Sequence, residues 1–197
     1  MNSNKNSLVN SPPTVQEFGA LHNLLIHPDK AALKIGDTKL GWTKVCHPQV
    51  RNIHNKVFGG YLMKEAFELA YACGRIFSRA RPLLLAQDLV QFVKPVEIGS
   101  ILNLNAKVVR SQGSPHRTFQ VSVEASVMDP VTGHSDVTNV FHFIFYTESM
   151  PVRNVIPQTY LEATEYLMAA RRQESSLSFE RVSSGQRWLI DPEQHGY

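Results

Sequence analysis

The segment NIHNKVFGGYLMKEAFELAYACGRIF, residues 52–77, holds the groups best suited to chemistry. It opens with a polar loop that contains Asn52 and Asn55, and the loop leads into a glycine pair, Gly59-Gly60, at the start of a long apolar helix. Glycine leaves the first backbone N–H groups of a helix uncrowded, and such a start can hold an anion or a polarised carbonyl. The segment therefore predicts a binding site at the beginning of this helix.

A carbonyl oxygen lodged against the N–H groups of Gly59 and Gly60 would be polarised by two donors and by the helix dipole. Attack by water would then require a group that orients or deprotonates the water. Asn52 can position the water through its amide, and Glu68, two turns into the helix, can act as base if a partner subunit brings it near. The candidate catalytic groups are thus Asn52, Gly60 and Glu68.

Each of these residues also has an interpretation without chemistry. A Gly-Gly pair can simply be a tight helix entry, and Asn52 can bond the backbone of its own loop. Glu68 falls beside Lys64 on the polar side of the helix, where a solvated ion pair is expected. We expect His54 and His142 to be structural rather than catalytic.

The sequence lacks the motifs of serine-hydrolase, nucleotide and metal sites. The chain has no GxSxG elbow of α/β serine hydrolases, and neither GxxxxGK[ST] nor GxGxxG of nucleotide sites. His47 and His54 are not at the spacing of metal ligands on a helix, and Cys46 and Cys73 are far apart. We expect no metal and no cofactor.

Composition narrows the class of protein further. The 197 residues fit one domain with extensions or two very small domains, and 43% hydrophobic content excludes wholesale disorder. A net charge of +3, without a basic stripe carrying aromatic residues, argues against a nucleic-acid partner. Two cysteines make no disulfide framework, which favours a reducing compartment.

The sequence gives no targeting signal. No apolar run approaches the roughly 18 residues needed to span a bilayer, so we expect no membrane span. The first residues, MNSNKNSLVNSPP, lack the apolar core of a secretory signal and the arginines of a transit peptide. With Met1 as the native start, the sequence by itself points to the cytosol.

Two helices and a first strand are expected around the segment. Residues 1–13 predict a disordered lead, and Thr14 with Glu17 predicts a capping box that starts a helix ending at 27–29. Residues 40–46 predict a strand, and residues 59–79 the long helix. The polar residues of this helix fall on one line, with Glu65 and Tyr71 at its edge: Lys64, Glu68, Arg75 and Arg79.

The rest of the chain predicts four more strands and a last helix. Residues 83–93 predict a strand, and apolar residues alternate with polar ones at 102–108 and 119–127. In the strand at 137–147, three phenylalanines share one face, and the other face is also too apolar for open water. A helix capped at Thr159 follows, and the chain from Gln173 onward is expected to be loose.

This order predicts an α+β fold. Short links make the strands antiparallel, and the sheet buries one face on a single central helix. Because one helix covers only one face, we expect the second face of the last strand to meet a partner or a neighbouring helix, and we expect dimerisation through the sheet. Residues 39–150 would form the domain, 1–38 a lead and linker helix, and 151–197 a C-terminal helix with a polar tail.

Four segments in order resemble the hotdog-fold acyl-CoA thioesterases, and more closely the second hotdog domain of the acyl-CoA thioesterase 9 family. They are CHPQVRNIHNKVFGGYLMKEAFELAYACG, KPVEIGS, TNVFHFIF and PQTYLEATEYL, within about residues 46–171. The resemblance implies a hotdog fold, in which an antiparallel sheet wraps around one long helix. It also implies hydrolysis of fatty acyl-CoA to free fatty acid and CoA without a metal, at an interface between two hotdog units.

The resemblance also assigns residues. In related enzymes an Asn sits at the position of Asn52 and the catalytic Asp at the position of Phe67, where this chain has no carboxylate. Glu68 or Glu65 would need a shifted helix register to replace it. The residues expected to contact substrate, or to line an acyl tunnel, lie at the loop and the first helical turns: Asn55, Phe58, Gly59, Tyr61, Met63 and Phe67.

The resemblance leaves three hypotheses. The leading one is an acyl-CoA thioesterase that works as a homodimer or a higher hotdog oligomer. The alternative, favoured by Phe67, is a catalytically silent half that binds acyl-CoA or pairs with a complete subunit. A hotdog dehydratase is weaker, because no His stands at the helix entry. Relatives are usually longer, with two hotdog units, and are mostly mitochondrial, so the resemblance implies a mitochondrial location. A truncated or fragmentary gene product would explain both the single unit and the lack of a visible transit peptide.

Overall fold

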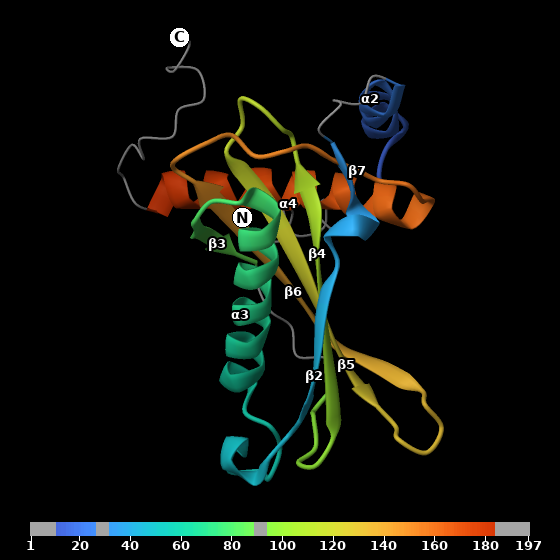
Figure 1. Ribbon diagram of the computed structural model, residues 1–197, viewed down its shortest axis with the longest axis vertical. Helices are drawn as coiled ribbons and strands as arrows, with labels where there is room; N and C mark the ends of the chain where they lie inside the picture. Colours follow the sequence, from blue (N-terminus) through green and yellow to red (C-terminus); the bar gives the residue numbers. More distant parts are fainter. Residues whose placement is uncertain (1–10, 27–31, 89–93, 184–197) are drawn as a thin grey trace.

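The computed structural model describes residues 11–26, 32–88 and 94–183 (Figure 1). Its helices are α2 (Val15–Ile26), α3 (Gly59–Ser78) and α4 (Tyr160–Ser183), with short 3₁₀ turns η1 (Ile35–Thr38) and η2 (Pro48–Val50). Its strands are β1 (Leu33–Lys34), β2 (Leu40–Val45), β3 (Pro82–Gln87), β4 (Ile101–Ser111), β5 (Thr118–Met128), β6 (Ser135–Thr147) and β7 (Val155–Ile156). Within these residues, no helix has the length and apolar character to cross a bilayer.

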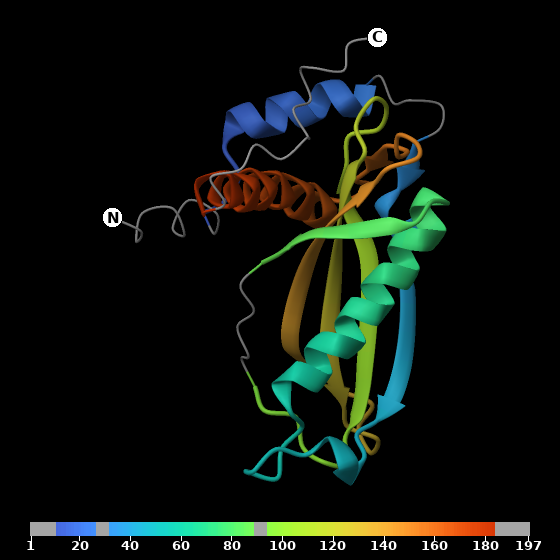
Figure 2. The same cartoon turned by 90° about the vertical axis from the view of Figure 1, so that its left-hand side faces the viewer.

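Five strands form one antiparallel sheet in the order β2-β4-β5-β6-β3. The predicted α+β fold is confirmed, because α3 lies along one face of this sheet (Figure 2). The long helix begins at Gly59 as predicted, and it ends at Arg79, which adopts the left-handed conformation with φ 56°. A second, two-stranded parallel sheet joins β1 to β7.

The inner face of the sheet forms the core with α3. The predicted alternation places Phe119, Phe141, Phe143 and Phe145 fully inside, and no part of their surface is exposed. At Gly74 the helix comes so close to β5 that an added Cβ would lie 2.8 Å from Cε2 of Phe119. Interlocked rings therefore fix how α3 lies on the sheet, and with it the position of the helix start.

The outer face of the sheet is partly covered by α4, which crosses it on the side opposite α3 (Figure 2). Lys107 of β4 pairs with Glu165 of α4 at 2.6 Å. Arg172 of α4 lies near His142 of β6, so part of the second face of β6 meets a neighbouring helix, one of the two outcomes expected. This cover also explains why Gln120 and Ser122, polar residues that alternate with the core residues of β5, are buried.

The two helical extensions contact each other. The capping box at Thr14 is formed, with the Thr14 N–H donating to Glu17 at 2.7 Å. Arg171 of α4 donates to the Glu17 carboxylate at 2.6 and 2.5 Å, and Phe18 stacks on Tyr160 with ring centroids 5.7 Å apart. The N-terminal helix is thus fastened to the C-terminal one.

Three expectations were wrong. The helix capped at Thr159 continues through Gln173 to Ser183, so that stretch is not loose. Ile35, predicted to lie in a linker, is fully buried in the core. Glu65, predicted at the edge of the polar stripe, is only 2% exposed. The expected lead at 1–10, the end of the strand at 89–93 and the tail at 184–197 lie outside the described residues.

Candidate functional site

The start of α3 offers two backbone donors. Phe58 is the N-cap in an extended conformation, and its carbonyl accepts from Tyr61 N–H at 2.9 Å and Leu62 N–H at 3.3 Å. Within the described part of the chain, neither the Gly59 nor the Gly60 N–H has a hydrogen-bond partner. The predicted polarising pair is therefore present and available to a carbonyl oxygen.

The ring of Phe58 lies over this helix start. A Cβ at Gly60 would come within 3.1 Å of the Cδ1 and Cζ atoms of Phe58, so glycine is needed here for the approach of the ring. Phe58 is itself 57% exposed. An exposed aromatic ring turns easily about its χ angles, so it can move aside for a ligand or pack on one.

Asn52 is fixed by its own loop at the same end of α3. Its side-chain oxygen accepts from the backbone N–H of His54 at 2.9 Å and of Lys56 at 3.0 Å, and Asn55 closes the turn with φ 59°. The Val57 N–H then donates to the Val96 carbonyl at 2.8 Å. The interpretation of Asn52 as a loop-forming residue is thus right for its oxygen.

The amide nitrogen of Asn52, unlike the side-chain oxygen, takes no part in this turn. It makes no hydrogen bond to any described residue, so it is a fixed donor that can serve a ligand or a water. The backbone of Phe58 donates to the Val50 carbonyl at 2.8 Å, which joins the loop to the helix start. Asn52, Gly59 and Gly60 therefore share one end of the helix, as the sequence predicts.

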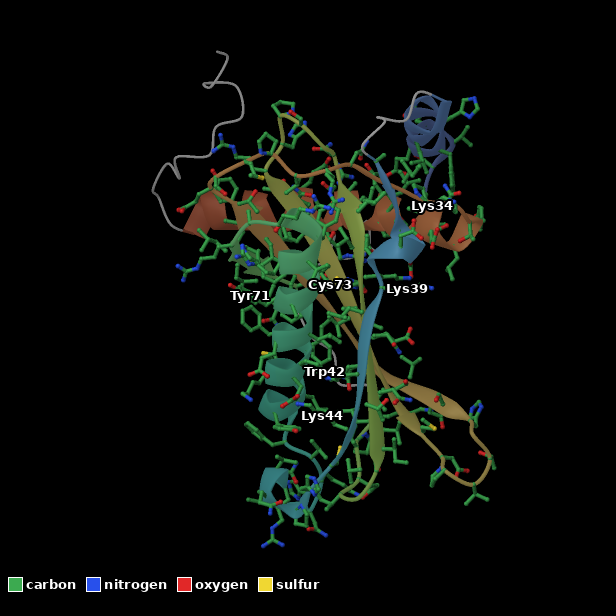
Figure 3. The ribbon with its side chains drawn as sticks, in the orientation of Figure 1. Lys34, Lys39, Trp42, Lys44, Tyr71 and Cys73 are labelled. Carbon is green, nitrogen blue, oxygen red and sulfur yellow. The ribbon has the colours of Figure 1, made fainter. Side chains whose placement is uncertain are left out.

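Glu65 is the residue that sequence reasoning placed wrongly. Its carboxylate lies under the inner side of β2 and pairs with Lys44, while Lys64 is 3.8 Å away (Figure 3 shows Lys44 and Trp42 on the side of β2 toward α3). Burial, and then the charge of Glu65, raise the pKa of Tyr61. Lys44 also lies 4.7 Å from the ring centroid of Trp42. The first turns of α3 are thereby tied to an edge strand.

A sequence signal for this pair existed. Lys44 falls on the same alternate face of β2 as Leu40 and Trp42, and this inward face is the less exposed one. An inward lysine on a strand needs a carboxylate, because an unpaired buried charge is costly. Neither polarity nor helical periodicity, however, says that the partner is Glu65.

Glu68 and Phe67, the two other candidate positions on α3, lie in different environments. Glu68 has a 46% exposed side chain and pairs with Lys64 at 3.1 Å, the solvated arrangement weighed above. Phe67 is half-buried, with its ring centroid 5.8 Å from that of Phe143 and 6.2 Å from that of Phe145. The position where related enzymes carry an acid is thus filled by a ring that packs on β6.

His142 lies half-buried between the sheet and α4, away from the helix start. Burial, and the charges of Arg172 and Lys107, lower its pKa to about 3, so it is neutral at pH 7. His54 is exposed and contributes its backbone N–H to the Asn52 turn. These placements agree with the structural roles expected for both histidines.

Comparisons with known proteins identify relatives of the chain. No protein-family model matches the chain. The chain is 37% identical over 179 residues to acyl-coenzyme A thioesterase 10, mitochondrial, of Mus musculus, and 36% identical over 199 residues to acyl-coenzyme A thioesterase 9, mitochondrial, of Bos taurus. These alignments cover 84% and 94% of this chain but only 40% and 44% of the relatives. The chain thus spans less than half the length of either protein.

Solved structures show the same fold. An acyl-CoA hydrolase from Staphylococcus aureus, in complex with butyryl coenzyme A, coenzyme A and coenzyme A disulfide, superposes with a TM-score of 0.71 at 24% identity, covering 79% of this chain and 95% of that one. An apo-hexameric acyl-CoA thioesterase superposes with a TM-score of 0.68 at 20% identity, covering 79% and 99%. The chain therefore has the hotdog fold and belongs among the homologues of acyl-coenzyme A thioesterases 9 and 10.

Proposed function

We propose that this chain takes part in the hydrolysis of fatty acyl-CoA to free fatty acid and CoA, at an interface between two hotdog units. One observation carries the proposal: the unpartnered N–H groups of Gly59 and Gly60 lie at the same end of α3 as the unpartnered amide nitrogen of Asn52. Likeness to named acyl-CoA thioesterases supports a thioester carbonyl as the group that these donors receive.

The chemistry needs donors and a base. The two glycine N–H groups would hold the carbonyl oxygen as it gains negative charge, which is where such donors contribute most. The Asn52 amide would orient the attacking water or the thioester. A carboxylate would remove a proton from the water as the water oxygen bonds to the carbonyl carbon. The carbon–sulfur bond would then break, and the CoA thiolate would take up that proton and leave as the free thiol.

The remaining role is that of the general base, and we assign it to Glu68. This carboxylate is on the exposed side of α3, and Lys64 is its one ion-pair partner among the described residues, so a second unit can meet it. Glu65 is a poorer base because Lys44 already holds it in the interior. In this assignment the Glu68 of one unit serves the Asn52 and Gly60 of another.

The second unit is most simply another copy of the chain. Tyr71 lies on the side of α3 away from β2 (Figure 3) and is half-exposed. Met63 and Phe67, at spacings of four residues before it, are half-exposed too, and the edge strand β3 exposes 44% of Leu84. An apolar helix side next to an unpaired strand edge is a surface for self-association. We therefore propose a homodimer or higher oligomer, in which Tyr61, Met63 and Phe67 line the acyl tunnel.

A second candidate function rests on Phe67. If the chain corresponds to the second hotdog domain of the longer relatives, the carboxylate would come from the other half, and this chain alone would bind acyl-CoA without hydrolysing it. The packing of Phe67 on Phe143 and Phe145 favours this version. A silent half needs no acid at position 67, so α3 can keep its register. The names of the relatives also lead us to propose a mitochondrial location, which fluorescence imaging of the tagged chain would test.

Release of free thiol from acyl-CoA of several chain lengths tests both versions on the purified chain. We expect turnover that Asn52→Ala and Glu68→Gln each reduce by about 100-fold, while Asn105→Ala, an exposed asparagine on β4, has no effect. Turnover that survives Glu68→Gln would remove Glu68 as base. Absence of turnover together with micromolar binding of acyl-CoA would establish the silent half instead.

A further inference from the structure

A cavity of about 400 Å³ lies at the opposite end of α3 from the candidate site. Its walls include apolar side chains of β1, β2 and α3, namely Leu33, Leu40, Ile76 and Phe77. Because a helix rises 1.5 Å per residue, Phe77 is about 25 Å along α3 from Gly60. This cavity is therefore separate from the acyl-CoA site proposed above.

Three cations line the same cavity. Lys39 comes from the junction of η1 and β2, Arg79 from the left-handed end of α3, and Arg153 from the segment before β7. In Figure 3 Lys39 lies at the height of Cys73, on the side of β2 away from α3. Burial and the nearby charge of Arg79 lower the pKa of Arg153. Segments far apart in the sequence thus place three cations around the cavity.

The three cations take part in no ion pair within the described structure. No carboxylate there forms an ion pair with Lys39, Arg79 or Arg153, although Asp37 also lines the cavity. The negative end of α3 accounts for Arg153 in part, since its Nη2 donates to the Phe77 carbonyl at 2.6 Å. It does not account for Lys39, which belongs to another element. Like charges around one cavity attract an anion that enters it.

We infer that this cavity binds a carboxylate carried on an apolar chain, the chemical class of a free fatty acid. The apolar walls suit the chain, and guanidinium groups bind carboxylates with paired N–H donors. A volume of about 400 Å³ is in the range of pockets for small ligands. A monoanion suits the site better than a phosphate dianion, because Asp37 would repel the second negative charge.

Calorimetric titration of the full chain with octanoate tests this inference. We expect saturable binding that the double variant Lys39→Gln/Arg79→Gln weakens at least tenfold. Both side chains belong to exposed residues, so the fold should persist, which the melting temperature would verify. The matched control is Arg75→Gln, an exposed arginine of α3 that does not line the cavity, and it should leave binding unchanged.

Two further arms separate this cavity from the acyl tunnel and from other anions. Ile76→Glu places a carboxylate on the 65% exposed wall residue, and it should abolish octanoate binding without altering thioesterase turnover. Octanol, which has no charge, and adenosine monophosphate should bind at least tenfold more weakly than octanoate. Equal binding of octanol, tighter binding of the nucleotide, or octanoate binding that is unchanged in the double variant would overturn the inference. Because binding is measured directly, the result does not depend on whether the chain hydrolyses acyl-CoA.

Discussion

Glu65 and Phe67 are two residues apart on α3 and project to opposite sides of the helix. Glu65 is held by Lys44 on the β2 side, and Phe67 packs against the phenylalanines of β6. A separation of two residues turns a side chain by about 200° around a helix, so Glu65 cannot replace an acid at position 67 while α3 keeps its register. Any carboxylate on the Phe67 side must therefore be introduced or supplied by a partner.

Phe67→Asp should raise thioesterase activity. The change puts a carboxylate where related enzymes are expected to carry their acid, and a placed general base contributes about 10²- to 10⁴-fold to a rate. We expect the catalytic efficiency on acyl-CoA to rise at least about tenfold, as measured by release of free thiol. Phe67→Asn is the control, because it removes the same ring packing without adding a charge. Equal activities of the Asp and Asn variants would refute a catalytic role for this position.

Lys44→Met should destabilise the protein far more than Lys64→Met. Removal of Lys44 leaves the Glu65 carboxylate, whose side chain is 3% exposed, without its main partner. Leaving such a charge in the interior costs about 3 kcal/mol, whereas a pair as exposed as Lys64–Glu68 contributes little because water screens it. Urea unfolding of the two variants at pH 7 measures the difference. Similar losses in both would show that the Lys44–Glu65 pair does not stabilise the first turns of α3.

The local pattern of apolar, polar and glycine residues was sufficient to predict the strands and the long helix. Strict alternation at 102–108 and 119–127 has only one physical solution, a strand with one buried face, and glycine marked the start of α3. The buried Glu65 could not be predicted because its environment depends on Lys44, 21 residues away in sequence. The length of α4 was missed because its polar residues, such as Gln173, bond to the sheet instead of to water.

The sequence was sufficient to predict the part of the candidate site that consists of backbone groups. Two glycines before an apolar helix indicate open N–H groups, and an Asn in a tight loop indicates a fixed amide. Roles that depend on a second unit cannot be read from one chain. The assignment of Glu68 as base is therefore still a prediction, as is the contact of Tyr61 and Phe67 with substrate.

Gly74→Ala should destabilise the core although alanine favours helices. Alanine gains about 1 kcal/mol in helix propensity, but its methyl group would lie 2.8 Å from Cε2 of the fully buried Phe119. Overpacking of this kind costs about 1–3 kcal/mol, so we expect a net loss on thermal unfolding. Gly19→Ala in α2, where no atom lies within 4 Å of the added Cβ, is the control and should be neutral or stabilising. Adding Phe119→Leu to Gly74→Ala should recover part of the loss, and its failure to do so would exclude the ring as the cause.

Acidification from pH 6.5 to pH 5 should weaken the protein through His142. This imidazole lies half-buried near Lys107 of β4 and Arg172 of α4, and its folded-state pKa falls to about 3. Because the ordinary pKa is about 6.5, the unfolded chain takes up a proton that the folded protein excludes. The stabilisation is therefore complete above pH 6.5 and is lost as pH falls toward 3, with a limiting slope of about 1.4 kcal/mol per pH unit.

Denaturant unfolding at several pH values between 6.5 and 5 measures this slope, and His142→Gln should remove it. The exposed His134→Gln is the control and should keep the slope of the parent chain. Glu17 does not interfere, because Arg171 lowers its folded-state pKa to about 2, and the stability that it contributes is lost only below its ordinary pKa of 4.5. A slope that persists unchanged in His142→Gln would mean that the proton is taken up elsewhere, and that α4 does not keep the imidazole neutral.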